Sequence, residues 1–184
     1  MTNLLIRLFV KDYQDVENHT VRERYGKFAG IVGIATNILL FCIKIFAGIV
    51  FHSVAIVADA VNNLSDSASS VVTLVGFKLS AKPADKEHPY GHARIEYISG
   101  LIVSLVILLL GFQLAQSSLG KILHPEESET SLVAVGILVV SVLIKLWQFL
   151  FYRTVGRRIS STTLEATAAD SRNDVFSTVA ILIG

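Results

Sequence analysis

Asp59-Ala-Val-Asn-Asn-Leu-Ser-Asp66 is a polar run within an otherwise apolar stretch of the chain. A second polar run, Asp170-Ser-Arg-Asn-Asp174, follows about a hundred residues later. Each run contains two oxygen-bearing side chains four residues apart, a spacing that places them on one face of an α-helix, about 6 Å apart along its axis. If the two helices face each other, these side chains converge and offer oxygen ligands to one metal ion. The predicted ligands are Asn62, Asp66, Asp170 and Asp174.

The composition is that of an integral membrane protein. Hydrophobic residues make up 52% of the 184 residues, charged residues make up 17%, and the mean hydropathy is +0.60. A soluble domain usually has about a quarter charged residues. The net charge of +1 and the lack of a basic patch with interleaved aromatic residues give no indication of nucleic-acid binding. Cys42 is the only cysteine, which excludes an intramolecular disulfide and a CxxC metal site.

The apolar runs predict an all-α membrane protein, a bundle of transmembrane helices. Residues 1–25 are expected to form an N-terminal cytoplasmic segment, and residues 26–184 the transmembrane domain. The helices are predicted at about 28–50, 53–79, 97–119, 131–152 and 160–184. Lys44 lies about two turns from the far end of the first of them, and we interpret it as a side chain that extends outward to the membrane surface.

The distribution of lysine and arginine predicts the orientation, because cytoplasmic connections carry an excess of both. The segment before the first helix, the loop between residues 80 and 96, and the turn with Arg153, Arg157 and Arg158 are basic. The connections on the other side contain only Lys121. The N-terminus is therefore expected in the cytoplasm. The last helix reaches Gly184 after an outward crossing with no basic flank, which we interpret as part of a longer protein.

The two acidic runs favour a transported metal ion. Carboxylates inside a membrane are costly, and facing pairs repel each other unless a cation or protons neutralise them. The competing interpretation is a structural network in which Arg172 pairs with one aspartate, but Arg172 is two residues from both Asp170 and Asp174 and points away from their face. Oxygen ligands suit Mn²⁺, Mg²⁺ or Fe²⁺, although raw affinity still favours Zn²⁺ over Mn²⁺ at many such sites. Protons compete for the same oxygens, which would permit exchange of metal for protons.

The loop before the third helix contains a second candidate site. Asp85, His88 and His92 are three and four residues apart, and imidazole nitrogens suit a borderline ion such as Zn²⁺. Pro89 argues against a regular helix in this segment, which weakens the spacing argument. A solvated polar loop without metal is the alternative.

The chain resembles the cation diffusion facilitators, a family of divalent-metal/proton antiporters. The resemblance covers residues 26–184, and its most specific parts are Ser53-Val-Ala-Ile-Val-Ala-Asp59-Ala, the loop from Lys82 to Glu96, and Arg172-Asn-Asp174. It implies a homodimer with six transmembrane helices and a C-terminal cytoplasmic ferredoxin-like domain. Five of those helices would then be present here, and the sixth helix and the ferredoxin-like domain would be missing.

The resemblance also implies the functional residues. The transport site falls on Asn62, Asp66, Asp170 and Asp174, and the loop site of some members falls on Asp85, His88 and His92. Zinc-transporting members usually have histidine at one or more of the four transport positions, so this ligand set is similar to the manganese-exporting bacterial branch. The expected function is Mn²⁺ efflux in exchange for H⁺ across a bacterial plasma membrane, with no cofactor besides the transported ion. Zinc, iron or cobalt efflux is the alternative.

Two other classes of protein remain open. Intramembrane prenyltransferases bind Mg²⁺-diphosphate with acidic clusters, but they need carboxylates near a helix end and basic residues for the diphosphate. Here the acidic pairs lie two to four turns inside their helices, with no lysine on the same faces. A purely structural membrane subunit is the other alternative. We therefore do not expect an enzyme.

Overall fold

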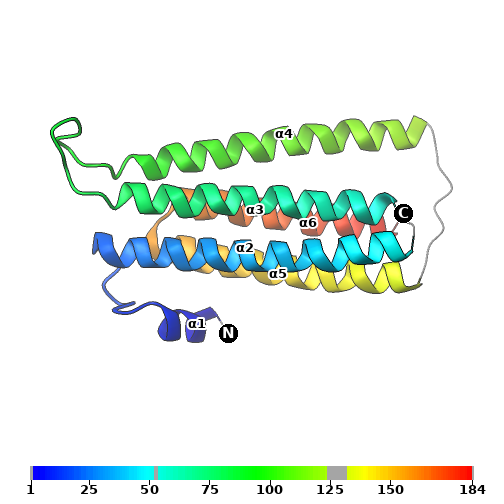
Figure 1. The fold of residues 1–184 in the computed structure, drawn as a ribbon, viewed down its shortest axis with the longest axis horizontal. Coiled ribbons are helices and arrows are strands. Elements are labelled where there is room, and N and C mark those ends of the chain that lie inside the picture. Colours follow the sequence, from blue (N-terminus) through cyan, green and yellow to red (C-terminus); the bar gives the residue numbers. More distant parts are fainter. Residues whose placement is uncertain (1, 52–53, 124–131, 184) are drawn as a thin grey trace.

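The protein is built from helices. The computed structural model describes residues 2–51, 54–123 and 132–183, and within these residues it contains no strand. The helices are α1 (Thr2–Phe9), α2 (His19–Val50), α3 (Val54–Ser80), α4 (Ile95–Leu123), α5 (Leu132–Ile159) and α6 (Thr162–Ile183). Helices α2 to α6 lie side by side as a long bundle, and the short α1 packs beside one end of it (Figure 1). The prediction of an all-α helical bundle is confirmed.

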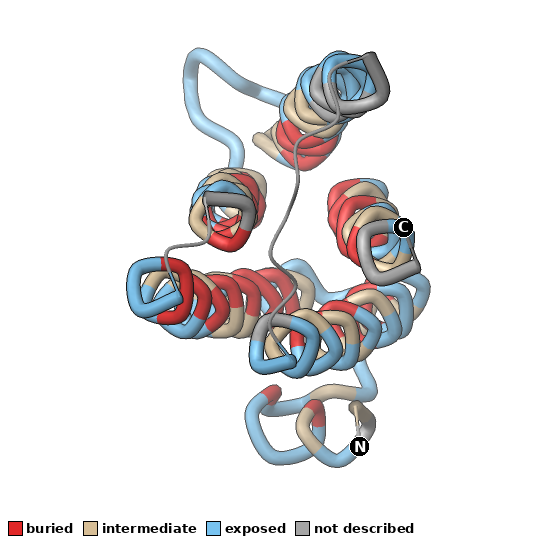
Figure 2. Tube along the Cα trace, turned by 90° about the vertical axis from the view of Figure 1, so that its right-hand side faces the viewer, coloured by how far each residue is buried: buried red, intermediate tan, exposed pale blue. Residues whose placement is uncertain are grey.

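The bundle consists of two closely packed helix pairs, and α4 runs alongside one helix of each pair. The most extensive contacts are between α2 and α3 and between α5 and α6, while α4 contacts α3 and α6. Helix α2 also contacts α5, whereas α3 and α6 contact each other far less. Viewed along the bundle, the buried faces of these helices turn inward and the exposed faces turn outward (Figure 2). A polar face on α3 or α6 can therefore be shielded from lipid.

Several helices are longer than the predicted membrane crossings. Helix α2 begins at His19, where the side chain of Asn18 accepts a hydrogen bond from the backbone nitrogen of Thr20 at 2.9 Å. Helix α5 continues to Ile159, seven residues past the predicted end at 152. Hydropathy marks the part of a helix that lies in lipid, and a helix continues beyond it until a cap or turn ends it. Positions 52, 53, 131 and 184, of which 53, 131 and 184 were predicted as helical, lie outside the described residues.

Three helical segments in the described part of the chain are long and apolar enough to cross a membrane. They are His19–Val50, Ile95–Gln113 and Val135–Ile159. Helices α3 and α6 carry the acidic runs, which lower their average hydropathy. Asp66 of α3 and Asp170 of α6 are buried inside the bundle, where they need no contact with lipid. The polar composition of these two helices is therefore compatible with a membrane position between apolar neighbours.

Small residues allow α2 and α3 to approach closely. A side chain at Gly26 would overlap the ring of Phe77, and one at Gly30 would come within 2.7 Å of the Cβ of Leu74. Glycine at these two positions lets the helices pack at a distance that no larger residue would permit. This close packing fixes the position of α3, and with it Asp66, relative to α2.

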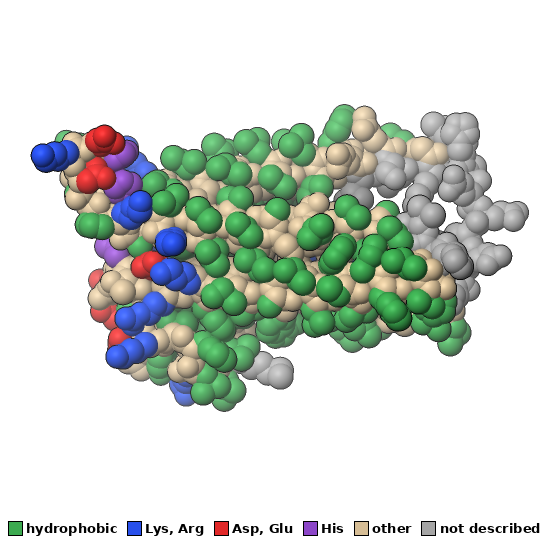
Figure 3. Space-filling view, viewed as in Figure 1, with side chains coloured by type: hydrophobic (Ala, Val, Ile, Leu, Met, Phe, Trp, Pro, Cys, Tyr) green, Lys and Arg blue, Asp and Glu red, His purple; other side chains and the backbone are tan. Residues whose placement is uncertain are grey.

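Charged side chains gather at one end of the bundle, around the loop between α3 and α4 and the neighbouring helix ends (Figure 3). Along the sides of the bundle the visible surface is mostly hydrophobic. On this end Arg22 of α2 forms an ion pair with Glu96 of α4 at 2.8 Å and also donates to the carbonyl oxygen of Ile159. The basic residues from which we predict a cytoplasmic N-terminus thus include several at this end of the bundle, and the orientation stays a prediction.

Candidate metal centre

Three carboxylates meet inside the bundle. Helix α3 contributes Asp66, and α6 contributes Asp170 and Asp174, one turn apart. Each of the three offers a carboxylate oxygen within 4.8 Å of the oxygens of the other two. Asp66 is 3% exposed and Asp170 is 7% exposed, so bulk water hardly solvates their carboxyl groups. The arrangement concentrates negative charge at one buried point, where a cation is strongly favoured.

Asn62, the fourth predicted ligand, lies beside the same group but is turned differently. Its Nδ2 atom donates a hydrogen bond to Oδ1 of Asp174 at 3.5 Å. The amide nitrogen, not the oxygen, therefore faces the carboxylates. An amide can present its oxygen after a half-turn about its last bond, because the two ends have nearly the same shape. Asn62 is thus placed at the site, and as a ligand it requires this rotation.

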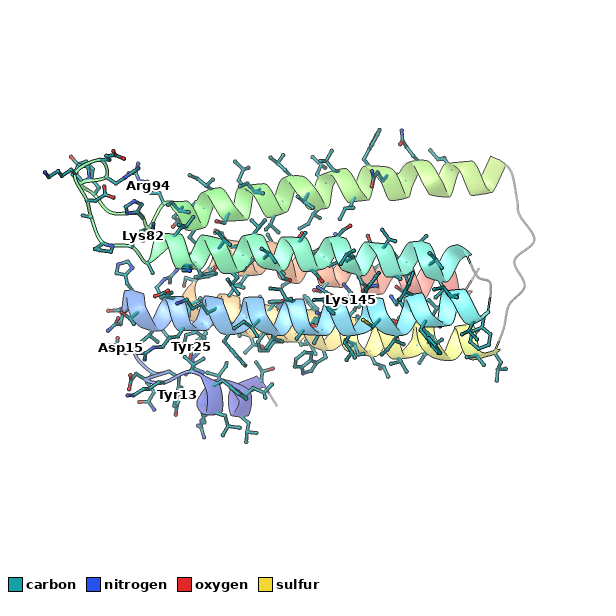
Figure 4. All side chains as sticks on the ribbon, in the orientation of Figure 1. Tyr13, Asp15, Tyr25, Lys82, Arg94 and Lys145 are labelled. Atoms are coloured by element: carbon teal, nitrogen blue, oxygen red, sulfur yellow. The ribbon has the colours of Figure 1, made fainter. Side chains whose placement is uncertain are left out.

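Lys145 of α5 is part of the site, although the sequence analysis did not identify it. Its Nζ atom lies 2.5 Å from Oδ2 of Asp66 and 2.7 Å from Oδ2 of Asp174. The side chain is buried inside the bundle, about midway along its length (Figure 4). A signal was available, because Lys145 is the only charged residue of the predicted span 131–152. Ionisable residues within a membrane span are functional candidates for that reason alone.

Several buried polar atoms on α3 and α5, the helices of Asp66 and Lys145, have no hydrogen-bond partner among the described residues. They include Oδ1 of Asp66, Oδ1 of Asn63 and Oε1 of Gln148. Nδ2 of Asn63 donates to the backbone of Asp59, and Nε2 of Gln148 donates to Oδ1 of Asn37 at 3.3 Å, so both amides are held with an oxygen free. Unpaired buried acceptors are uncommon in proteins and call for a ligand or a partner. This surplus of acceptors suits a cation.

A second ion pair lies on the same face of α3, about two turns before Asp66. Nζ of Lys44 is 2.8 Å from Oδ2 of Asp59, and the Lys44 side chain is 2% exposed. The interpretation that Lys44 extends to the membrane surface is therefore wrong. A carboxylate on the adjacent helix offers a closer partner than the membrane surface, and pairing removes the penalty of an isolated charge.

Arg172 takes no part in the described site. Its side chain is exposed on α6, as its position two residues from Asp170 and Asp174 predicts. The counter-charge that we considered for a purely structural network is supplied by Lys145 of another helix.

The loop candidates also lie together, on the exposed end of the bundle. Asp85, His88 and His92 each offer a ligand atom within 4.8 Å of the others. Nδ1 of His92 is 3.1 Å from the carbonyl oxygen of Pro83, and its Nε2 is 3.5 Å from Oδ2 of Asp85. A backbone carbonyl on one ring nitrogen is the usual way to orient the other nitrogen toward a metal ion. The segment is a loop and not a helix, as Pro89 predicts.

Local hydrogen bonds shape this loop. Oδ1 of Asp85 accepts from the backbone nitrogen of His88 at 2.6 Å and from that of Glu87 at 3.0 Å. The hydrogen bond from the His88 backbone holds the pKa of Asp85 below its usual value, and the nearby imidazoles of His88 and His92 act in the same direction. Asp85 is therefore a fixed, ionised acceptor.

The chain is similar in sequence to a known protein family and to several named proteins. Residues 30–184 match the family described as the cation efflux transmembrane domain. The chain is 33% identical to the manganese efflux system protein MneS of Bacillus subtilis over 88% of its own length and 58% of that protein. It is 27% identical to the manganese efflux system protein MneP of the same organism, over 89% of this chain and 54% of the relative.

The names of other relatives do not mention manganese. The magnetosome protein MamM of Paramagnetospirillum magneticum is 31% identical over 84% of this chain and 49% of that protein. An uncharacterized transporter of Methanocaldococcus jannaschii is 32% identical over 84% of this chain and 54% of the relative. The chain thus spans about half the length of the curated relatives it matches.

Proposed function

The chain belongs to the cation efflux family, the cation diffusion facilitators, and from this premise we propose that it moves divalent metal ions outward across a membrane. The observation that carries the proposal is the cluster of Asp66, Asp170 and Asp174, whose carboxylate oxygens lie within 4.8 Å of one another. A soluble metal-binding protein has no need to place such a cluster midway along apolar helices. Members of this family are transporters, so the prenyltransferase alternative loses its support.

Mn²⁺ is the proposed ion. The proposed ligands are the three carboxylates and the amide of Asn62, a set of oxygen atoms without imidazole or thiolate. Oxygen ligands suit hard ions, whereas Zn²⁺ prefers nitrogen and sulfur. Two relatives, MneS and MneP, are named manganese efflux proteins. Zinc, iron or cobalt efflux by the same site is the alternative.

Exchange for protons is the proposed source of energy. A carboxylate must be deprotonated to bind a metal ion, so each bound ion displaces protons and each arriving proton favours release. Asp170 is buried and is not one of the two carboxylates that pair with Lys145, so it would carry such a proton.

Three further expectations belong to this proposal. The N-terminus lies in the cytoplasm, the assembled transporter is a homodimer, and the loop with Asp85, His88 and His92 binds Zn²⁺ or a similar ion. The short distances among the loop ligands support the last of these.

The test is metal uptake into proteoliposomes that contain the complete gene product, with Mn²⁺, Zn²⁺, Fe²⁺, Co²⁺ and Cd²⁺ offered in turn and internal pH recorded. We expect Mn²⁺ to give the largest flux, with protons moving in the opposite direction. Asp66→Ala and Asp174→Ala should reduce the flux to that of empty liposomes. Glu165→Ala is the matched control, since it removes an exposed carboxylate from the same helix as Asp174.

Each part of the proposal fails separately. Unchanged Mn²⁺ flux in both aspartate variants would show that the carboxylate cluster is not the transport site. A larger flux of Zn²⁺ than of Mn²⁺ would show that Zn²⁺ is the preferred ion. Mn²⁺ flux without any proton movement would exclude exchange for protons.

A further inference from the structure

We propose that Lys145 is a tethered competitor of the transported ion: its ammonium group pairs with Asp66 and Asp174 between transport events and must leave them when a divalent ion binds. This inference rests on the proposed function, because it assigns a role to a side chain at the same site. It concerns a residue of α5, a helix that supplies none of the predicted ligands.

The ammonium group lies where an ion would be bound. Nζ of Lys145 is within 2.7 Å of oxygen atoms from both Asp66 on α3 and Asp174 on α6. Divalent ions bind carboxylate oxygens at about 2.0–2.2 Å, so an ion shared by these two residues needs nearly the same position. Lys145 and the ion therefore cannot both bridge the same two oxygens.

Electrostatics favours displacement over sharing. A divalent ion and an ammonium group held on the same carboxylates would repel each other across a very short distance inside a buried site. Lys145 is 4% exposed, so water does not screen this repulsion. The carboxylates exchange one positive partner for another, and at no stage does the site hold three uncompensated negative charges.

The surroundings offer the displaced ammonium group another acceptor. Gln148 lies three residues further along α5, which places it on the same face one turn away. Its side chain is fully buried, its Nε2 atom already donates to Thr36 and Asn37, and its Oε1 atom has no hydrogen-bond partner among the described residues. A flexible lysine side chain can swing along its own helix to such an oxygen. Gln148 thus provides a position in which Lys145 stays hydrogen-bonded away from the ion.

Competition from Lys145 keeps metal binding reversible. A cluster of three carboxylates without a built-in cation would hold a divalent ion tightly and release it slowly. The tethered ammonium group returns to Asp66 and Asp174 when the ion leaves, which makes release less costly. Lys145 is therefore a positioning residue that sets affinity, and it is not itself a ligand.

The test measures the affinity of the complete, purified protein for Mn²⁺ by equilibrium dialysis at fixed pH. We expect Lys145→Met to lower the Kd about tenfold or more, because the competitor is gone while all ligands remain. Lys44→Met is the matched control: it removes an equally buried lysine that pairs with Asp59 outside the carboxylate cluster, and we expect a Kd within about threefold of wild type. An unchanged or higher Kd in Lys145→Met overturns the inference.

A second measurement uses the unaltered side chain, in case Lys145→Met does not fold. Electron–nuclear double resonance on Mn²⁺ bound to protein with ¹⁵N-labelled lysine reports any lysine nitrogen beside the ion. The inference expects none, and a strong lysine coupling overturns it.

Asp174→Ala separates failure of this inference from failure of the proposed site. If wild type does not bind Mn²⁺, or if Asp174→Ala binds it equally well, the proposed metal site is wrong, and so is the role of Lys145 that depends on it. If Asp174→Ala abolishes binding while Lys145→Met leaves the Kd unchanged, only the role of Lys145 is wrong.

Discussion

The intramembrane cluster and the loop cluster are built from similar parts in opposite ways. Each brings three potential ligands within 4.8 Å of one another. The loop cluster lies within eight consecutive residues, and Asp85 is held by hydrogen bonds from the backbone of its own turn. The intramembrane cluster joins Asp66 to two aspartates that are more than a hundred residues away, and it needs a lysine from a third helix. A site in water is shaped locally, whereas a site in a membrane depends on the whole bundle and on a built-in counter-charge.

Removal of that counter-charge is the sharpest test of the comparison. We expect Lys145→Met, in the absence of metal, to lower the free energy of unfolding by about 3–5 kcal/mol, because it leaves buried carboxylates without a partner. Added Mn²⁺ should restore most of this loss, since it binds the folded protein alone. Asp85→Asn in the exposed loop should change stability far less, because water screens the charges there. Thermal melting with and without Mn²⁺ measures all three, and equal losses for the two variants would contradict the comparison.

Removal of a loop ligand should affect one site only. We expect His92→Gln to weaken binding of Zn²⁺ to the loop by about ten- to a hundredfold, because it replaces the imidazole that Pro83 orients. Binding of Mn²⁺ inside the membrane should stay as it is. Calorimetric titration with each ion separates the two sites. A parallel loss of Mn²⁺ binding would show that the loop and the intramembrane cluster are not independent.

Exchange of one ligand type inside the membrane should move the preference of the transporter toward that of the loop. We expect Asp170→His to raise the ratio of Zn²⁺ to Mn²⁺ flux about tenfold, since imidazole suits Zn²⁺ better than carboxylate does. His88→Asp, the reverse exchange in the loop, should leave this ratio within about twofold. Flux measurements in proteoliposomes decide the matter. If Asp170→His gains no zinc transport, ligand identity is not what selects the ion.

The smallest expected effect concerns pH at the loop. The pKa of Asp85 lies below its usual value of 3.8, so the hydrogen bonds that it accepts are fully present above that pH. They are lost as pH falls through the lowered pKa in the folded protein. The amide signal of His88, whose nitrogen donates to Asp85 at 2.6 Å, should therefore titrate with a midpoint below 3.8. Nuclear magnetic resonance measures this, and Asp85→Asn, which should not titrate, is the control.

The sequence predicts the helices, and it identifies the acidic residues that the structure brings together. Four-residue spacing identifies Asp170 and Asp174 as neighbours and places Asp66 on one face with Asn62, and the structure brings Asp66 together with Asp170 and Asp174. Spacing within one helix is a local property, so it can be read from the chain. The helix ends are less predictable, because α2 and α5 continue past the apolar residues that mark the membrane.

The basic half of the site could not be read in the same way. Lys145 and Lys44 each pair with an aspartate on another helix, and their partners depend on which helix faces lie together. No local pattern contains that information. The orientation of the Asn62 amide likewise depends on its neighbour Asp174 across the helix contact.

The turn between α5 and α6 has a mechanical consequence. Only Ser160 and Ser161 separate the two helices, and Ser161 closes the start of α6 by accepting from the backbone nitrogen of Leu164 at 3.3 Å. The α5–α6 hairpin therefore carries Lys145, Asp170 and Asp174 as one unit, while the α2–α3 pair carries Asp66. A rocking motion between these two units would lengthen the ion pair between Lys145 and Asp66 and leave the ion pair between Lys145 and Asp174 intact. Under the proposed function, the contact surface between these two units passes through the metal site, so a motion that separates the units would also weaken the binding of the ion.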